Sequence, residues 1–164
     1  MKDMEAIIHF ICDFEIGLHN AVKTVFKQCH ITGCYIHYVQ SLIKKARGHK
    51  IFKYLHSKSA EIHTNGIVLF RRICHLPYLP SNSIPEMFEA IVDETKKDII
   101  LYDIFKEYFK YFKRFWIKTI DTKILSIYKI KDNTINSQER YHKTLNGKIG
   151  SKPLLRKFLG VLPF

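Results

Sequence analysis

A short run in the last quarter of this 164-residue chain combines the residue types from which metal-ion and proton-transfer sites are built. Residues 133–142 read Asn-Thr-Ile-Asn-Ser-Gln-Glu-Arg-Tyr-His, so one carboxylate, Glu139, stands among amides, with His142 three residues later. Asn136 or Ser137 can cap a helix here, which puts Glu139 in its first turn and His142 one turn further on. The helix dipole alone also favours a first-turn carboxylate, so the run has a purely structural explanation as well.

A second carboxylate, Asp13, ends the apolar run from Ile7 to Cys12, which predicts a buried strand because it is brief and lacks helical spacing. Apolar residues at helical spacing between Leu18 and Phe26 predict a helix of about three turns. Residues 31–38 are β-branched and aromatic and predict a second strand. Strand, helix, strand is typical of a parallel α/β unit, whose carboxyl edge gathers ligands and would carry Asp13. The alternative, that Asp13 caps the following helix, stays open.

Cys34 and His37 have the C-x-x-H spacing of a zinc half-site. A structural zinc ion takes four ligands, and the other cysteines and histidines form no second well-spaced pair. We therefore expect a buried cysteine beside a hydrogen-bonding histidine rather than zinc. The four cysteines of this lysine-rich chain are expected to be reduced thiols of an intracellular protein.

From about residue 50 the pattern changes to helices. Residues 83–86, Ser-Ile-Pro-Glu, form a capping box with proline in the first turn and predict a helix start. Aromatic and apolar residues then recur at helical spacing from Leu101 to Trp116, and we interpret this stripe as core rather than as a base-stacking platform. A polar linker at 131–134 leads to the Glu139 run. No apolar run approaches the roughly 18 residues that a membrane span needs.

The chain carries 27 Lys and Arg against 15 Asp and Glu, a net charge of +12. Such an excess favours a polyanionic partner, either nucleic acid or an anionic membrane surface. The basic residues concentrate in the ranges 41–75 and 106–131, which favours a surface that tracks phosphates, although any single lysine can simply be solvated. They do not form one clean amphipathic face, which argues against a membrane. The candidates for DNA contact are Lys44, Lys45, Arg47, Lys50, Lys53, Arg71, Arg72, Lys113 and Arg114.

Several short motifs follow one another in a specific order along the chain. They are Asp13-Phe-Glu15, Gly33-Cys34-x-x-His37-x-x-Gln40, Leu76-Pro-Tyr-Leu-Pro80, Tyr111-Phe112 with Trp116-Ile117, the run 133–142, and Lys152-Pro153. In this order they resemble the transposase domain of Mutator-like elements, the MULE transposase domain. The resemblance implies a helix-rich α/β fold: an RNase H-like DDE core, here partial, interrupted by a large all-helical insertion. Residues 1–42 would belong to the core, 43–127 to the insertion and 128–164 to the final core helices.

The resemblance also implies a chemistry. In such enzymes three carboxylates hold two Mg²⁺ or Mn²⁺ ions about 3.5–4 Å apart, which activate the attacking oxygen and stabilise the leaving one. Asp13 corresponds to the family's second catalytic Asp and Glu139 to its catalytic Glu. Cys34, His37, Asn136 and His142 stand at family-motif positions. The implied partners are DNA and a second copy or a full-length transposase, and the implied location is the nucleus.

The chain departs from the family pattern at its beginning. The family's first Asp lies well upstream of the second, whereas only twelve residues precede Asp13. Asn133 stands where the family usually has Arg, and Ile135 where it has Asn. We therefore expect an N-terminally truncated transposase with two of three carboxylates, which binds DNA but does not cut it alone. The missing strands would leave a sheet edge unpaired, which invites association. The alternative is a non-enzymatic, transposon-derived basic module for DNA binding or assembly.

Overall fold

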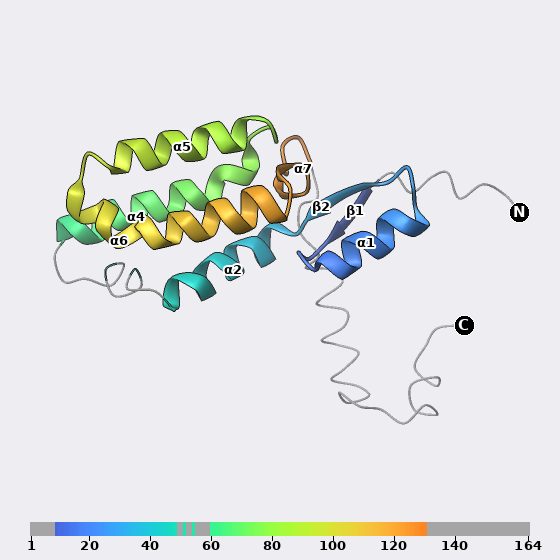
Figure 1. The fold of residues 1–164 in the computed structure, drawn as a ribbon, viewed down its shortest axis with the longest axis horizontal. Helices are drawn as coiled ribbons and strands as arrows, with labels where there is room; N and C mark the ends of the chain where they lie inside the picture. The colour runs from blue at the N-terminus through green and yellow to red at the C-terminus, as the bar shows by residue number, and fades with distance from the viewer. Residues whose placement is uncertain (1–8, 49–50, 52–53, 55–59, 131–164) are drawn as a thin grey trace, which may run out of the picture. The chain divides into compact units, whose positions relative to one another are not determined.

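The computed structural model describes residues 9–48, 51, 54 and 60–130, with the backbone alone for residues 60–63. All of these belong to one compact unit, Met1–Thr134, and a second unit comprises Ile135–Phe164. The run with Glu139, Asn136 and His142 therefore lies outside the described residues, as do Lys50 and Lys53. The fold is a helix-rich α/β arrangement with one small parallel sheet (Figure 1).

The predicted strand–helix–strand unit is confirmed. Strand β1 spans His9–Cys12, helix α1 spans Ile16–Val25, and strand β2 spans His30–Gly33. The strands pair in parallel, with a register that sets His9 opposite His30 and Cys12 opposite Gly33. Helix α1 buries His19 and Val22. These two residues are three apart and so lie on one side of the helix, whereas Leu18 and Val25 remain 39% and 69% exposed.

The second strand is shorter than its sequence predicts. It ends at Gly33, and Cys34 is the N-cap of helix α2, Tyr35–Arg47, where the Tyr38 N–H donates to the Cys34 carbonyl at 3.0 Å. Tyr38, Leu42 and Ala46 recur every four residues and are all fully buried. Burial of this helical stripe outweighs the strand preference of the β-branched and aromatic residues. The C-x-x-H motif thus lies at a helix start, not on a strand, and α2 continues through the expected boundary at residue 42.

The remaining described elements are helical, as the sequence pattern after about residue 50 predicts. They are α4 (Ala60–His75), the 3-10 turn η1 (Leu76–Tyr78), α5 (Ser83–Thr95), α6 (Ile99–Phe112), the π-helical η2 (Lys113–Thr119) and α7 (Thr122–Leu125). Figure 1 shows α4, α5 and α6 side by side. Helix α5 begins at Ser83 as predicted, but the capping box does not form, because Asn82 is the N-cap and makes no side-chain cap bond. No helix in this part of the chain is long and apolar enough to cross a membrane.

The aromatic stripe forms the core, as the sequence predicts. Phe105, Tyr108, Phe109, Phe112 and Trp116 are all buried, and η2 extends the stripe one turn beyond α6. The two buried hydroxyls in this core find backbone acceptors, as buried polar groups must. The hydroxyl of Tyr38 donates to the Ile73 carbonyl at 2.7 Å, and that of Tyr108 donates to the Leu42 carbonyl at 3.1 Å. These two bonds fix α2 against α4 and α6.

Candidate carboxylate edge and nucleic-acid surface

Asp13 lies at the carboxyl edge of the sheet, where the sequence places it. Because Cys12 pairs with Gly33, the residues that follow the two strands, Asp13 and Cys34, emerge at the same edge. The Cys34 N–H donates to the Cys12 carbonyl at 2.7 Å and closes this edge. In open parallel sheets, ligands and functional groups gather at the carboxyl ends of the strands.

Asp13 is half-buried and organises the turn into α1. Its Oδ1 accepts a hydrogen bond from the Glu15 N–H at 3.1 Å, and its carbonyl accepts one from Nε2 of the buried His19 at 2.7 Å. The N-cap of α1 is Glu15, and its own side chain makes no cap bond. The carboxylate of Asp13 therefore forms an Asx turn before the helix, in addition to its position at the sheet edge, and Asp13 is not the N-cap that the alternative expected.

Phe14, the residue after Asp13, is anchored in the helical core. Its ring meets Trp116 edge-on at 4.7 Å between centroids and lies 6.5 Å from the ring of Tyr38. Gly33 makes room for this ring, since a Cβ added at Gly33 would lie 2.1 Å from Cε1 of Phe14. The position of Asp13 relative to the helices thus depends on a glycine in β2.

We expect Gly33→Ala to destabilise the protein by about 1–3 kcal/mol, because the added methyl displaces a ring that already packs against Trp116. The matched control is Gly17→Ala in α1, where an added Cβ meets nothing within 4 Å. That change should be neutral or stabilise by up to about 1 kcal/mol. Urea unfolding followed by circular dichroism measures both, and equal free energies of unfolding for Gly33→Ala and the unmutated protein would contradict the packing described.

Cys34 and His37 do not form part of a metal site in the described ranges. Cys34 is fully buried at the N-cap of α2, and His37 is half-buried in the first turn. Within residues 9–48, 51, 54 and 60–130, no three His, Cys, Asp or Glu residues come together as a metal would require. Asp13 therefore has no second and third carboxylate among the residues that the structure describes.

The thiols of Cys12 and Cys74 are held protonated. Burial, followed by the charge of Asp13, raises the pKa of Cys12 from 9.0 to about 11, and burial alone raises the pKa of Cys74 to about 12. Since the thiolate is the reactive form, both thiols should resist alkylation at pH 8 in the folded protein and react at once in guanidinium. Because unfolding restores the pKa of 9.0, these thiols also lower stability as pH rises from 9 towards 11–12. Mass-spectrometric mapping of iodoacetamide labelling at several pH values measures how strongly the fold protects each thiol.

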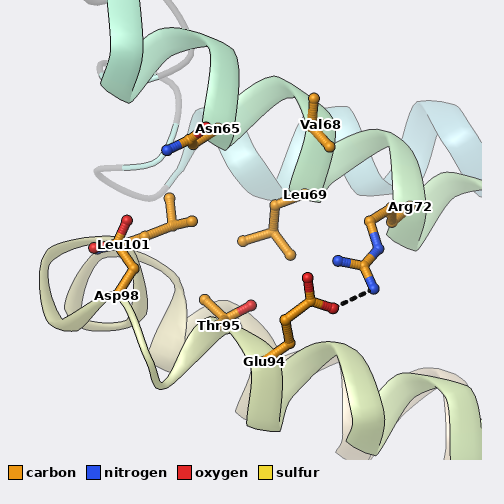
Figure 2. A pocket seen from close by; sticks show the side chains of 8 residues that line it. All are labelled: Asn65, Val68, Leu69, Arg72, Glu94, Thr95, Asp98 and Leu101. Atoms are coloured by element: carbon orange, nitrogen blue, oxygen red, sulfur yellow. Dashed lines mark hydrogen bonds and ion pairs between the residues drawn. The ribbon is translucent and has the colours of Figure 1, made fainter.

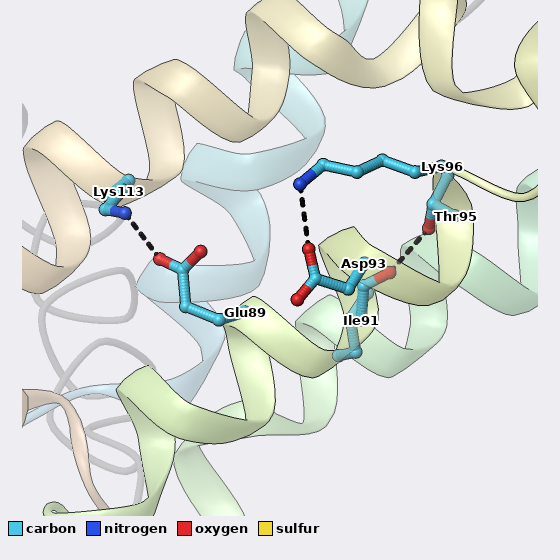
Figure 3. Close-up of polar contacts among 6 residues, drawn as sticks. All are labelled: Glu89, Ile91, Asp93, Thr95, Lys96 and Lys113. Carbon is cyan, nitrogen blue, oxygen red and sulfur yellow. Dashed lines mark hydrogen bonds and ion pairs between the residues drawn. The ribbon is translucent and has the colours of Figure 1, made fainter.

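The structure separates the predicted DNA-contacting residues into two groups. Arg72 pairs with Glu94 at 2.7 Å and Lys113 with Glu89 at 2.6 Å, so carboxylates compensate both cations (Figure 2 shows the first pair and Figure 3 the second). Figure 3 also shows Lys96 bound to Asp93 on α5 at 2.8 Å. By contrast, α2 and η2 contain no Asp or Glu of their own. Within the described ranges, the cations of these two elements without a carboxylate partner are Lys44, Lys45, Arg114 and Lys118, whereas Lys113 on η2 pairs with Glu89.

These two elements lie side by side. The rings of Tyr38 and Trp116 are 4.8 Å apart, and Nζ of Lys45 lies 4.7 Å from the centroid of the Tyr111 ring, which stacks on Phe115 at 5.8 Å and 12°. Lys44 adjoins Lys45 on α2, and Arg114 and Lys118 precede and follow Phe115 on η2. We call the resulting surface the basic seam; it comprises Lys44 and Lys45 from α2 and Arg114 and Lys118 from η2.

The basic seam has the chemistry of a phosphate-binding surface. Lys44, Arg114 and Lys118 are exposed, and Lys45 is held over the face of Tyr111 by a cation–π contact. Cations at spaced positions along two adjacent elements neutralise successive phosphates. Lys118 was not among the candidates from the sequence, because only the packing of η2 against α2 shows that it continues the seam.

Comparison with known proteins adds no relative. No family model, curated protein or solved structure matches the chain. The motifs, the sheet edge and the basic seam are therefore the features that bear on function.

Proposed function

We propose that this chain is part of a Mutator-like DDE transposase and that it binds DNA through the basic seam without cutting DNA by itself. The observation that carries the proposal is the position of Asp13. It directly follows β1, at the carboxyl edge that β1 shares with β2, and a series of helices follows the second strand. This order of elements is the one that the resemblance implies for an interrupted RNase H-like core.

The described residues do not by themselves fit a two-metal site. They offer Asp13 at the sheet edge without two further ligands beside it, and Glu139 lies outside the described ranges. A single carboxylate holds a hard divalent ion only weakly, since Mg²⁺ and Mn²⁺ prefer several oxygen ligands. We therefore derive no catalytic step through a metal, and the proposed role is the binding of DNA.

The basic seam supplies that role. Its cations contact phosphate oxygens, which carry no sequence information, so the chain binds duplexes of different sequence with similar affinity. Transposon DNA in the nucleus and other copies of a transposase are the partners that this role implies. The second candidate function is a non-enzymatic DNA-binding module, which the basic seam supports as well.

A plasmid assay tests the proposal. The purified chain is incubated with supercoiled DNA and about 5 mM Mg²⁺ or Mn²⁺, in excess over the usual affinity of such sites. Gel retardation without nicking is expected, and Asp13→Asn or Glu139→Ala should leave retardation unchanged. Nicking that Glu139→Ala abolishes would show that the chain is a complete nuclease. Absence of retardation would contradict both candidate functions.

The two candidate functions differ when the coding sequence upstream of Met1 is added to the expressed protein. A transposase should gain a strand that ends in Asp, and nicking should then appear and depend on Asp13 and Glu139. An extended protein that still retards DNA but never nicks it would leave only the DNA-binding module.

A further inference from the structure

The outer edge of β1 is open in the part of the chain that the structure describes. The sheet there consists of β1 and β2 alone, and α7 packs against β2. Residues 31–33 of β2 are buried, whereas Phe10 and Ile11 of β1 are only half-buried. Parallel sheets are normally covered, and an open edge is a template for pairing with another strand.

Two residues of β1 direct their backbone hydrogen-bonding groups away from β2. The Cys12 carbonyl accepts a bond from the Cys34 N–H, so the backbone groups of Cys12 face β2, as do those of Phe10 two residues earlier. Those of His9 and Ile11 alternate with them and therefore point outward. These outward groups are the ones that a further strand would bind.

Helix α1 exposes apolar side chains on one flank. Leu18 and Val25 are seven residues, or about two turns, apart and so lie on the same flank, where they are 39% and 69% exposed. The end of α1 packs on β1, because the rings of Phe26 and Phe10 are 5.0 Å apart. With the buried side of α1 turned to the sheet, the right-handed crossover of such units places the exposed flank above the outer edge of β1.

The charge of this surface suits self-association. Residues 9–26 contain Lys23 against Asp13 and Glu15, although the whole chain has a net charge of +12. A second copy can therefore approach here without the repulsion between the basic surfaces, and nucleic acid is not attracted to this side.

We propose that the outer edge of β1 pairs antiparallel with the same edge of a second copy of this chain, about a twofold axis. The register that sets Ile11 opposite Ile11 of the second copy pairs the outward backbone groups of both strands. It also sets His9 opposite Asp13 of the second copy, so that an imidazole meets a carboxylate, and Phe10 opposite Cys12. The strand is thus complementary to itself, which an interface between identical surfaces requires.

The same pairing covers the exposed flank of α1. Neighbouring strands are about 4.8 Å apart, so two helices that each pack over a β1–β2 pair come to lie two strand spacings, or about 10 Å, apart. Packed helices have this separation. The two copies of α1 run antiparallel, with Leu18 of one opposite Val25 of the other. A second copy therefore fits better than an isolated strand, which would leave both side chains exposed. The inference names a surface of self-association and does not depend on DNA binding by the basic seam.

Sedimentation equilibrium of the full chain, freed of nucleic acid, tests the proposal. We expect a mass of about 39 kDa, twice the 19.4 kDa of one chain, at micromolar concentrations. Val25→Lys should raise the dissociation constant at least about tenfold, because it buries a charge between the helices. The control Ile16→Lys makes the same change nine residues, or two and a half turns, away on the opposite flank, at a residue that is 48% exposed, and should leave the dimer intact. A monomer of the unmutated chain, or equal dissociation by the two variants, would overturn the proposal.

Replacement of Ile11 by proline tests the strand pairing separately. The Ile11 N–H points outward, so Ile11→Pro leaves the bonds between β1 and β2 in place and removes the central bond of the dimer. We expect a monomer with the circular-dichroism spectrum of the unmutated chain, whereas Ile11→Val should remain dimeric. Val25→Lys, at a residue exposed in one chain, provides the test if proline disturbs the strand. A folded dimer that persists in either Ile11→Pro or Val25→Lys would overturn the proposal, because the copies would then associate through another surface.

Discussion

Replacement of Trp116 by alanine should destabilise the protein by about 3–5 kcal/mol, a large fraction of the stability of a single domain. Trp116 is fully buried, and its ring contacts those of Tyr38 on α2, Phe14 beside the sheet edge and Phe115 on η2. Its removal therefore leaves a cavity where three parts of the described fold meet. Urea unfolding followed by circular dichroism measures the loss.

Two further variants make this test specific. Trp116→Phe keeps an aromatic ring in the same space and should cost less than Trp116→Ala, because a smaller cavity remains. Tyr128→Ala removes a ring that is 45% exposed and should change stability by no more than about 0.5 kcal/mol. A loss below about 1 kcal/mol for Trp116→Ala would mean that the three parts do not meet at this residue.

Removal of the basic seam should reduce DNA affinity on the order of a thousandfold at about 0.1 M salt. The variant replaces Lys44, Lys45, Arg114 and Lys118 by alanine. Each phosphate contact contributes about 0.9 to the slope of log affinity against log salt, so the loss of four contacts lowers the slope by about 3 to 4. Fluorescence anisotropy with a labelled duplex measures both the affinity and the slope.

The chain offers a control with the same change in net charge. Lys96, Lys106 and Lys110 form ion pairs on α5 and α6, and Lys97 lies beside them. Replacement of these four lysines by alanine removes the same four charges from a different surface. The slope of this variant should stay close to that of the unmutated protein. If both variants lose affinity equally, net charge rather than the seam determines DNA binding.

Local patterns in the sequence predict much of the described fold. The brief apolar run before Asp13 predicts β1, because a short apolar run without helical spacing favours a strand. The spacing of apolar residues after Leu18 predicts α1, because residues at this spacing share one face of a helix. The aromatic stripe predicts the core for the same reason. In each case a single period of hydrophobicity determines the local structure.

The sequence fails where long-range packing decides. Residues 34–38 have strand-forming side chains, yet Tyr38 begins the buried face of α2, because its ring packs between Trp116 and Phe112, almost eighty residues away. In the sequence, Arg72 and Lys113 do not differ from the other basic candidates. Only the structure shows that Glu94 and Glu89 pair with them. Pairing across helices cannot be inferred from spacing along one helix, so the sequence includes these two cations and misses Lys118.

The most direct test of DNA binding by this chain is the salt dependence of its affinity for a duplex of about 20 base pairs. Four phosphate contacts by the basic seam predict that log affinity falls against log salt with a slope of about −3.6 or steeper. Between about 50 and 200 mM salt, the affinity should then fall at least about a hundredfold. An affinity that stays flat over this range would contradict a phosphate-binding surface and, with it, the proposed function.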